Sequence, residues 1–506
     1  MSAMMTVRNT SALLILCSLL AIGTCPPRSA GAGTVTLSID DAVRTALEKN
    51  LGLQAATFTP AIAETGVRKA RAIYDPQFTS LFDYRGSNLK SAPLASLVTR
   101  TRSFDLNASV SRLLPTGATA GLSFTNLWVE DNLQSPLSRF VEPQLTLSFS
   151  QPLLQGLGRE VTERDITNAE DAMEASLADW SQQALTTAAT ARDQYLALVV
   201  ARESVETRRA SLDLARQVHS ENEARVKAGV LAAYQLQDST LGVLQAQKNL
   251  LDAERAEKDA ADLLRTTLHL ATGTAIATAP VPPPVPSDVS EADALRTAMR
   301  RRPDLVKARV AVQTAEFNEH VSRNLALPSL ALEGSGGVAG LETAYGPAFD
   351  EMRSGEYPIW TIGLTFSVPI GNHSALADLA AARLKASQAR TQLSATEESA
   401  TLEVRTALRS LTSAREQIGV TAQGVKAAEV LLDSYLKRQQ LGLATTKDVL
   451  DVSASLTQAR ESFTAARADY QSAFTKLWKA TGELLDREGI RFEASAIASG
   501  KRKGTP

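Results

Sequence analysis

The chain has 506 residues, of which 44% are apolar, 21% charged and 5% aromatic, and its formal net charge is −2. This near-neutral balance gives no sign of a polyanion-binding protein, because binding phosphates requires a concentrated surplus of Lys and Arg, so we expect no nucleic-acid partner. Both cysteines, Cys17 and Cys25, lie close to the N-terminus, which excludes an internal disulfide framework as the source of stability.

Residues 1–32 have the three parts of a secretory signal peptide. Arg8 precedes an apolar stretch over 12–22, and the small residues 30–32 give a cleavage pattern. An alternative is lipidation at Cys25, which follows small residues in "IGTC". Beyond this leader no apolar run reaches roughly 18 residues, the minimum for a membrane-spanning helix, so membrane insertion would have to rest on strands.

One pattern occurs twice along the chain. The matching blocks are "DDAVRTALEKNLGL" (40–53) with "EADALRTAMRRRPDL" (291–305), "LTLSFSQP" (145–152) with "IGLTFSVP" (362–369), "KAGVLAAYQLQDS" (227–239) with "QLGLATTKDVLDV" (440–452), and "LHLATG" (268–273) with "LWKATG" (477–482). A proline-rich stretch lies between the two copies. Because proline cannot continue a helix, this stretch predicts an extended linker. We therefore predict, in chain order, a first structural repeat over 33–277, a linker over 278–288, a second structural repeat over 289–486 and a flexible C-terminal tail over 487–506.

Two stretches, from Gly158 to Gly229 and from Gly371 to Gly442, contain no proline and read as very long helices. Apolar or small residues recur every seven positions in both, a period that packs helices side by side as coiled coils. The positions are Leu177, Ala184, Ala191, Leu198, Val205 and Leu212 in the first stretch, Val404, Leu411, Ile418, Val425 and Leu432 in the second, and Val449, Leu456, Phe463, Tyr470 and Leu477 in the segment that returns from it. We predict one long helical hairpin in each repeat.

Strand-like segments show a different period. In "WTIGLTFSV" (360–368) apolar and polar residues alternate, and 144–150 and 76–84 follow the same pattern. Alternation fits a half-buried strand of a soluble sheet, but in an exported chain it also fits a strand with lipid on one face and water on the other. We predict membrane strands over 75–86 and 143–151, an additional hairpin over 104–128 outside the membrane or at its rim, and a loop over 334–358 in its place in the second half.

The order of these features resembles the TolC-like outer-membrane efflux protein family across almost the whole mature chain. The resemblance implies a mixed α and β fold with duplicated long coiled-coil hairpins and four barrel strands per chain. It further implies a homotrimer with a 12-stranded outer-membrane β-barrel, a periplasmic α-helical tunnel, and a periplasmic adaptor and an inner-membrane pump as partners. Four strands are too few to close a barrel, because about eight strands is the smallest barrel that side chains can fill, so several copies would have to join.

The resemblance also implies two functional regions. The hairpin tips, which would contact the adaptor, fall at Gly229, Val230, Leu231, Gly442, Leu443 and Ala444. Asp448 and Asp451 lie three apart on one helix face and would contribute to a ring of carboxylates at the tunnel constriction. The alternatives are an ordinary helix break at the tips and a solvated helix face at the two acids.

Other gate features of the family are missing. Ala444 occupies the position of an expected arginine, Gln439 that of a tyrosine, and Tyr234 and Gln235 those of a Thr-Asp pair. We therefore expect the closed state to be held by different contacts.

Catalytic patterns are not found. The histidines 219, 269, 320 and 373 are scattered, and neither metal-ligand spacings nor nucleotide-binding loops occur, so we expect no enzyme and no cofactor. The sequence predicts a passive outer-membrane exit duct of a tripartite efflux or type I secretion system. The alternative is a lipid-anchored periplasmic coiled-coil scaffold, attached through Cys25 and without a pore.

Overall fold

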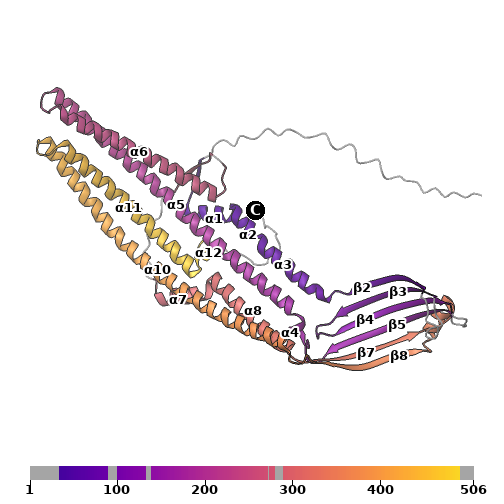
Figure 1. The fold of residues 1–506 in the computed structure, drawn as a ribbon. Helices are drawn as coiled ribbons and strands as arrows, with labels where there is room; N and C mark the ends of the chain where they lie inside the picture. The colour runs from indigo at the N-terminus through magenta and orange to yellow at the C-terminus, as the bar shows by residue number, and fades with distance from the viewer. Residues whose placement is uncertain (1–33, 89–99, 133–137, 272, 280–288, 490–506) are drawn as a thin grey trace, which may run out of the picture.

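The computed structural model describes residues 34–88, 100–132, 138–271, 273–279 and 289–489. These residues form an elongated molecule with a β-sheet at one end and the turns of two long helical hairpins at the other (Figure 1). The predicted leader 1–32 with Cys25, most of the predicted linker 278–288 and most of the predicted tail 487–506 lie outside the described residues.

The sheet has six strands, and each pairs antiparallel with its neighbours. In spatial order they are β2 (Gln77–Asn88), β3 (Arg100–Leu113), β4 (Thr119–Asp131), β5 (Arg139–Pro152), β7 (Ser329–Ala339) and β8 (Pro358–Ser367). The first repeat therefore supplies four strands and the second supplies two, in one continuous sheet (Figure 1). The repeated phrases at 145–152 and 362–369 lie on β5 and β8, with β7 between them.

The sheet differs from the sequence predictions in two respects. It has six strands, where four barrel strands per chain were predicted, and the hairpin predicted over 104–128 lies inside the sheet. It forms β3 and β4, turns at Pro115–Gly117 with Gly117 at φ 86°, and separates β2 from β5. The hairpin can form inner strands of the sheet because apolar and polar residues alternate in β3 and β4 with the same period of two as in the neighbouring strands.

Residues 334–358 are not the predicted loop. β7 runs through this glycine-rich stretch to Ala339, and α9 (Tyr345–Ser354) follows. Glycine lowers strand propensity, which explains the wrong prediction, but here it permits a close approach. A Cβ at Gly337 would lie 2.4 Å from the carbonyl oxygen of Leu145 on β5, a distance that no side chain tolerates.

Helices make up the rest of the described chain, apart from two short strands. In the first repeat they are α1 (Ile39–Lys49), α2 (Leu51–Ala56), α3 (Phe58–Arg71), the 3₁₀ turn η1 (Ala72–Tyr74), α4 (Arg159–Thr162), α5 (Arg164–Lys227) and α6 (Tyr234–Thr267). In the second they are α7 (Glu291–Arg301), α8 (Pro303–Leu325), α10 (His373–Gln440), α11 (Thr446–Thr481) and α12 (Leu484–Arg487). None of these helices has the length and apolar character needed to cross a membrane.

Each repeat places two shorter helices along one very long helix. α5 packs against α6 towards the hairpin turn and against α3 towards the sheet, and α10 packs in the same way against α11 and α8 (Figure 1). Many residues of the predicted seven-residue series are buried at these contacts, including Leu198, Val205, Val404, Leu411 and Val449. The predicted long hairpins are therefore present.

The middle of the molecule holds the largest packed clusters. One joins α7, α10 and α11 around Tyr470 and Phe474, whose rings lie 5.0 Å apart. The other joins α1, α5 and α6 to the parallel pair β1 (Thr34–Leu37) and β6 (Ala275–Thr278), which the sequence did not predict. Tyr195 of α5 fastens this pair, because its hydroxyl lies 3.0 Å from the carbonyl oxygens of both Leu37 and Ala279.

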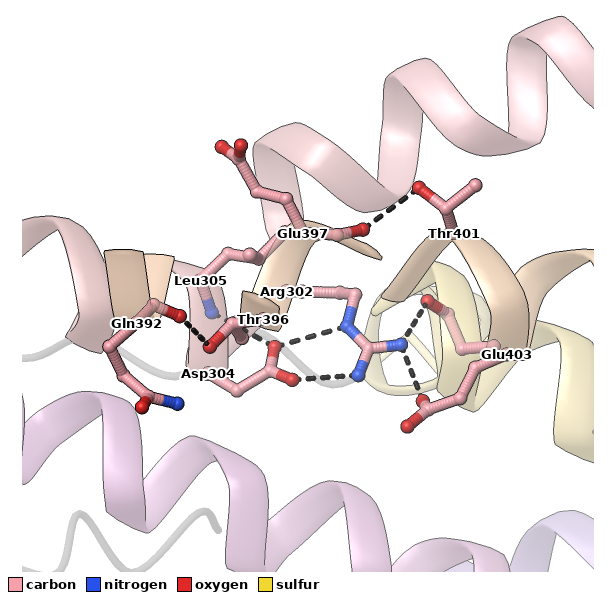
Figure 2. Close-up of polar contacts among 9 residues, drawn as sticks. Arg302, Asp304, Leu305, Gln392, Thr396, Glu397, Thr401 and Glu403 are labelled. Carbon is pink, nitrogen blue, oxygen red and sulfur yellow. Dashed lines mark hydrogen bonds and ion pairs between the residues drawn. The ribbon is translucent and has the colours of Figure 1, made fainter. Parts of the chain in front are cut away.

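A buried arginine fixes the corner between α7 and α8 (Figure 2). The guanidinium of Arg302 donates to the carboxylate of Asp304 at 3.0 and 2.7 Å, to Glu403 of α10 at 2.7 Å and to the carbonyl of Ala480 in α11 at 3.1 Å. Burial disfavours the charged form, but the hydrogen bonds to Asp304 and Glu403 outweigh it and raise the pKa of Arg302. The paired charge therefore ties this corner to both helices of the second hairpin.

Candidate functional site at the hairpin tips

The first hairpin turns through a Schellman motif. α5 ends at Lys227, and Gly229 takes the left-handed conformation with φ 74°. Its N–H donates to the Val226 carbonyl at 3.0 Å, and the N–H of Val230 donates to the Arg225 carbonyl at 3.0 Å. These two bonds satisfy carbonyls that the end of the helix would otherwise leave without a donor.

The second hairpin repeats this turn. Gly442 has φ 78°, and its N–H donates to the Gln439 carbonyl at 3.0 Å, while the N–H of Leu443 donates to the Arg438 carbonyl at 2.9 Å. The backbone pattern and the position of the glycine are the same as in the first tip. The duplication seen in the sequence therefore extends to individual hydrogen bonds of the turns.

Apolar side chains point into solvent at both tips. Val230 is 77% exposed in the first tip, and Leu441 and Leu443 are 73% and 67% exposed in the second. Leu231 and Ala444, which the sequence also places at the tips, are half-buried. Exposed aliphatic residues beside a rigid turn are suited to bind a protein partner.

Asp448 has a local structural role. It is the third residue of α11 and forms a capping box with Thr445, whose backbone N–H and side-chain hydroxyl donate to the Asp448 carboxylate at 2.8 and 2.7 Å. The hydroxyl of Thr445 accepts the N–H of Asp448 at 3.2 Å in return. The hydrogen bond from the Thr445 hydroxyl is the main cause that lowers the pKa of Asp448. The carboxylate is therefore held ionised at the start of the helix, where the helix dipole favours it.

Asp451 lies one turn further along α11, and it is exposed. The structure thus brings the two predicted acids to one side of the same helix end, close to the tip at Gly442. Only Asp448 is engaged by the cap, so the two carboxylates differ in their surroundings. Substituting each acid alone can separate capping from any role of charge at the pore.

Directly below the tips, a polar cluster joins the two hairpins. We call Asn222, Gln439 and Thr446 the inter-hairpin cluster; they are 1%, 6% and 4% exposed. The side-chain amide of Asn222 on α5 donates to the Thr446 hydroxyl on α11 at 2.8 Å, and the Gln439 amide of α10 lies 3.5 Å from the same oxygen. Arg225 of α5 adds a bond at 3.3 Å to the Gln439 carbonyl.

Apolar packing shields this cluster on its sheet side. Val218 of α5 packs with Leu432, Val449 and Leu456 of the second hairpin. Hydrogen bonds that are shielded from water are costly to break, because each buried polar group then loses its partner without gaining a solvent contact. The cluster therefore resists separation of the two hairpins.

Sequence reasoning missed both the cluster and the cap, although each had a signal. Asn222 follows the buried Ala215 by seven residues and so occupies a seam position of the coiled coil, where a polar residue specifies how helices pair. Thr445 and Asp448 have the spacing of a capping box. Gln439, recognised only as a departure from the family pattern, is the residue that brings α10 into the cluster.

The described histidines do not come together. His219 has its Nδ1 3.0 Å from the Ser239 hydroxyl of α6, so it packs within the first hairpin, and His320 faces Glu160 at 3.2 Å. Among the described residues, no group of three or more His, Cys, Asp or Glu side chains is arranged to hold a metal ion.

Comparison with known proteins gives matches in sequence and in fold. Residues 294–483 match the family model described as outer membrane efflux protein. The outer membrane efflux protein BepC of Brucella suis is 24% identical over 203 residues, which cover 40% of this chain and 43% of BepC. The pyoverdine export outer membrane protein OpmQ of Pseudomonas aeruginosa is 26% identical over 447 residues, which cover 83% of this chain and 88% of OpmQ. The match to BepC thus spans less than half of that protein.

The fold matches a solved channel over most of its length. The crystal structure of the Campylobacter jejuni CmeC outer membrane channel has a TM-score of 0.66 with 17% sequence identity, over 91% of this chain and 88% of CmeC. Likeness at this identity establishes the fold. Together with the family match and the relatives, it confirms the predicted resemblance: this chain is similar in sequence and fold to the TolC-like outer-membrane efflux proteins.

Proposed function

We propose that this chain forms the outer-membrane exit duct of a tripartite efflux or type I secretion system. Three copies join as a homotrimer, whose strands close a β-barrel in outer-membrane lipid and whose helices continue as a tunnel into the periplasm. An inner-membrane pump delivers substrates through a periplasmic adaptor protein. Transport through this chain is then passive and requires neither a cofactor nor a catalytic residue.

The observation that carries this proposal is the exposed apolar face of the sheet. On β8 the large side chains of Trp360, Ile362, Leu364 and Phe366 are 76%, 73%, 66% and 62% exposed. A water-soluble protein rarely exposes such a continuous row, whereas a strand in a membrane barrel presents it to lipid. The alternating residues of β8 include Thr361, Thr365 and Ser367, which suit a water-filled interior.

The arrangement of the two ends supports the same proposal. The hairpin turns lie at the far end of the molecule from the sheet (Figure 1), so a sheet held in the outer membrane directs the tips into the periplasm. There the exposed residues Val230 and Leu443 are available to an adaptor. Asp448 and Asp451, repeated by threefold symmetry, would gather six carboxylates around the narrow end, which favours the passage of cations.

Fractionation and conductance test the proposal. We expect a heat-modifiable trimer in outer-membrane fractions and discrete single-channel currents when the purified protein is added to planar bilayers. Recovery from the soluble or lipid-anchored pool, without channel activity, would contradict the proposal and favour the scaffold attached through Cys25.

A further inference from the structure

The apolar face of the sheet continues through the hairpin β3–β4, with the buried Asn126 of β4 as a polar member. Residues that lie directly opposite one another in antiparallel strands share a face, so the register defines rows across the sheet. One such row consists of Phe78, Val110, Leu122, Leu147, Gly336 and Trp360, one residue from each strand. Every member is apolar or glycine, including the two that the hairpin supplies.

The opposite face is mainly polar, although Leu127 and Val129 of β4 also lie on it. The adjacent row consists of Gln77, Ser111, Gly121, Ser148, Ser335 and Thr361. The hairpin members, Ser111 and Gly121, again match their neighbours in character. β3 and β4 are therefore patterned for the same two environments as the strands on either side of them.

β3 has the length expected of a membrane strand. Its residues 104, 106, 108 and 110 are Phe, Leu, Ala and Val, and the intervening residues are polar. Charged residues end this band on both sides, with Arg112 towards the helices and Arg102 towards the far end, where it faces Glu130 on β4. The nine residues between the arginines extend about 30 Å, which matches the apolar band of a tilted membrane strand.

The apolar band does not follow the rows of paired residues; its position shifts along the strands from one edge of the sheet to the other. On β2 its large residues run from Phe78 to Tyr84, and on β8 they run from Trp360 to Phe366, although Trp360 shares its row with Phe78. The shift is about six residues, or about 20 Å, over five steps of about 4.8 Å, which corresponds to a strand tilt of about 40°. The strands of membrane barrels are tilted by about 35–45°. At this tilt the apolar band runs parallel to the membrane plane across all six strands, as expected if all six belong to one barrel wall.

One helix lies against part of this face. α9 packs beside the far end of β5, where Val141 is buried, and its Phe349 contacts Phe124 of β4 at a ring distance of 5.9 Å. The face remains open towards the helices, where Val110 and Leu147 are exposed. Because Phe124 lies opposite Ala108, α9 covers part of the apolar band itself, in the half of β4 and β5 that is farther from the helices.

We propose that the hairpin β3–β4 is part of the membrane wall, so that each copy contributes six strands and three copies close an 18-stranded barrel. This inference rests on the proposed outer-membrane trimer. The even number of strands lets β8 of one copy meet β2 of the next in antiparallel orientation, which continues the pattern of the sheet. Because barrel diameter grows roughly linearly with strand number, the barrel would be about 1.5 times as wide as one of 12 strands.

Spin-label accessibility in reconstituted bilayers tests the proposal. Val110→Cys and Ser109→Cys place labels on opposite faces of β3, while Leu147→Cys and Ser148→Cys do the same on β5, and Leu147 shares a row with Val110. The unsubstituted chain, with Cys17 and Cys25, gives the background labelling. We expect the ratio of oxygen to nickel-chelate accessibility to be severalfold higher at 110 than at 109, as it is at 147 relative to 148.

The outcomes separate the two proposals. Alternation on β5 together with full water accessibility at both β3 positions would overturn the 18-stranded wall and leave the outer-membrane channel intact. Loss of alternation at both pairs would overturn the membrane wall itself, and the inference with it. Electron cryo-microscopy of the purified trimer counts the strands directly, and a wall of 12 would also refute the inference.

Discussion

The side-chain amide of Asn222 on α5 donates to the hydroxyl of Thr446 on α11 across 2.8 Å, and both residues are buried. The bond joins the two hairpins directly below their tips. Opening the proposed constriction by moving one hairpin relative to the other must therefore break it. We expect the inter-hairpin cluster to take the place of the tyrosine and arginine contacts that the family pattern predicts.

Asn222→Ala should make the channel open more readily. The substitution removes the donor and leaves the Thr446 hydroxyl in a buried site, which costs about 1–3 kcal/mol for a hydrogen bond of this kind. If that energy stabilises only the closed state, the ratio of open to closed channels rises about 5–150-fold. Single-channel recording measures the ratio directly.

Gln217→Ala is the matched control for Asn222→Ala. Gln217 lies on the same helix, but its side chain bonds to Glu221 on the exposed surface of α5. This variant should leave the open fraction unchanged. Equal open fractions in Asn222→Ala, Thr446→Val and the unsubstituted channel would show that the cluster does not hold the closed state.

Substitutions of the two acids should separate capping from charge. Asp451→Asn is expected to reduce cation selectivity while leaving thermal stability unchanged, because Asp451 is exposed and lies outside the capping box. Asp448→Asn should reduce both, since it removes a charge and weakens the cap. Thr445→Ala should lower thermal stability and leave cation selectivity unaltered. Reversal potentials in a salt gradient measure the selectivity.

The cap also has a predictable pH dependence. The folded-state pKa of Asp448 is lowered by its bonds to Thr445, so its stabilising effect is present above the ordinary Asp value and is lost as the pH falls through the lowered one. The second tip should therefore loosen only below about pH 4. Amide hydrogen exchange at the start of α11, followed as the pH falls, measures this loosening, and the dependence should vanish in Asp448→Asn. Equal pH dependence in both proteins would argue against the cap as its origin.

Gly442→Ala should destabilise the second tip by about 1–2 kcal/mol, because a side chain at φ 78° is strained even where space is available. Gly424→Ala is the control, since Gly424 lies inside α10 with open space where a Cβ would lie, and alanine there should stabilise the helix by about 0.5–1 kcal/mol. Thermal unfolding of the trimer in detergent gives both values. A stabilising effect at Gly442 would contradict the strained turn.

Arg302→Gln should cost about 1.5–3 kcal/mol, because it removes charge-assisted hydrogen bonds of a buried guanidinium, while Asp304 and Glu403 keep part of their contact with water (Figure 2). The adjacent Arg301 pairs with Asp486 near the surface, so Arg301→Gln should cost less than about 1 kcal/mol. Denaturant midpoints followed by circular dichroism compare the two. Similar midpoints would contradict the structural role of Arg302.

The stability of Arg302→Gln should also depend less on pH than that of the native protein. Burial raises the pKa of Asp304, but in the native protein the hydrogen bonds from Arg302 outweigh burial and lower it, so this group stabilises the fold above its ordinary pKa and ceases to do so as the pH falls through the folded-state value. Without the guanidinium, only backbone hydrogen bonds still oppose burial, so the pKa of Asp304 should rise and the variant should lose less stability than the native protein on acidification near pH 4. A parallel loss of stability in both proteins would refute the pairing.

The helical part of the fold could be predicted in detail because its information is local. The length of α5 follows from the absence of proline between Gly158 and Gly229, and its buried side follows from the seven-residue series through Leu198 and Val205. Both patterns are properties of a single segment. The turn glycines are equally local. For these elements, helix period and backbone chemistry determine the structure.

The sheet and the inter-hairpin cluster could be predicted only in part, because they depend on which distant segments meet. The alternation in β3 is visible in the sequence, but the sequence does not state that β3 and β4 intervene between β2 and β5. Similarly, Asn222 and Thr446 are more than 200 residues apart in the chain, and nothing local indicates that one is the partner of the other. The register of strands and the pairing of helices arise from packing across the whole fold.

The turns at Gly229 and Gly442 are each closed by backbone hydrogen bonds and a single glycine, so their conformation does not depend on the neighbouring side chains. Positions such as Val230 and Leu443 can therefore be exchanged for others of different size or charge without unfolding the hairpins. In the proposed assembly, a surface of this kind would let adaptor preference diverge between related proteins while the framework beneath it stays constant.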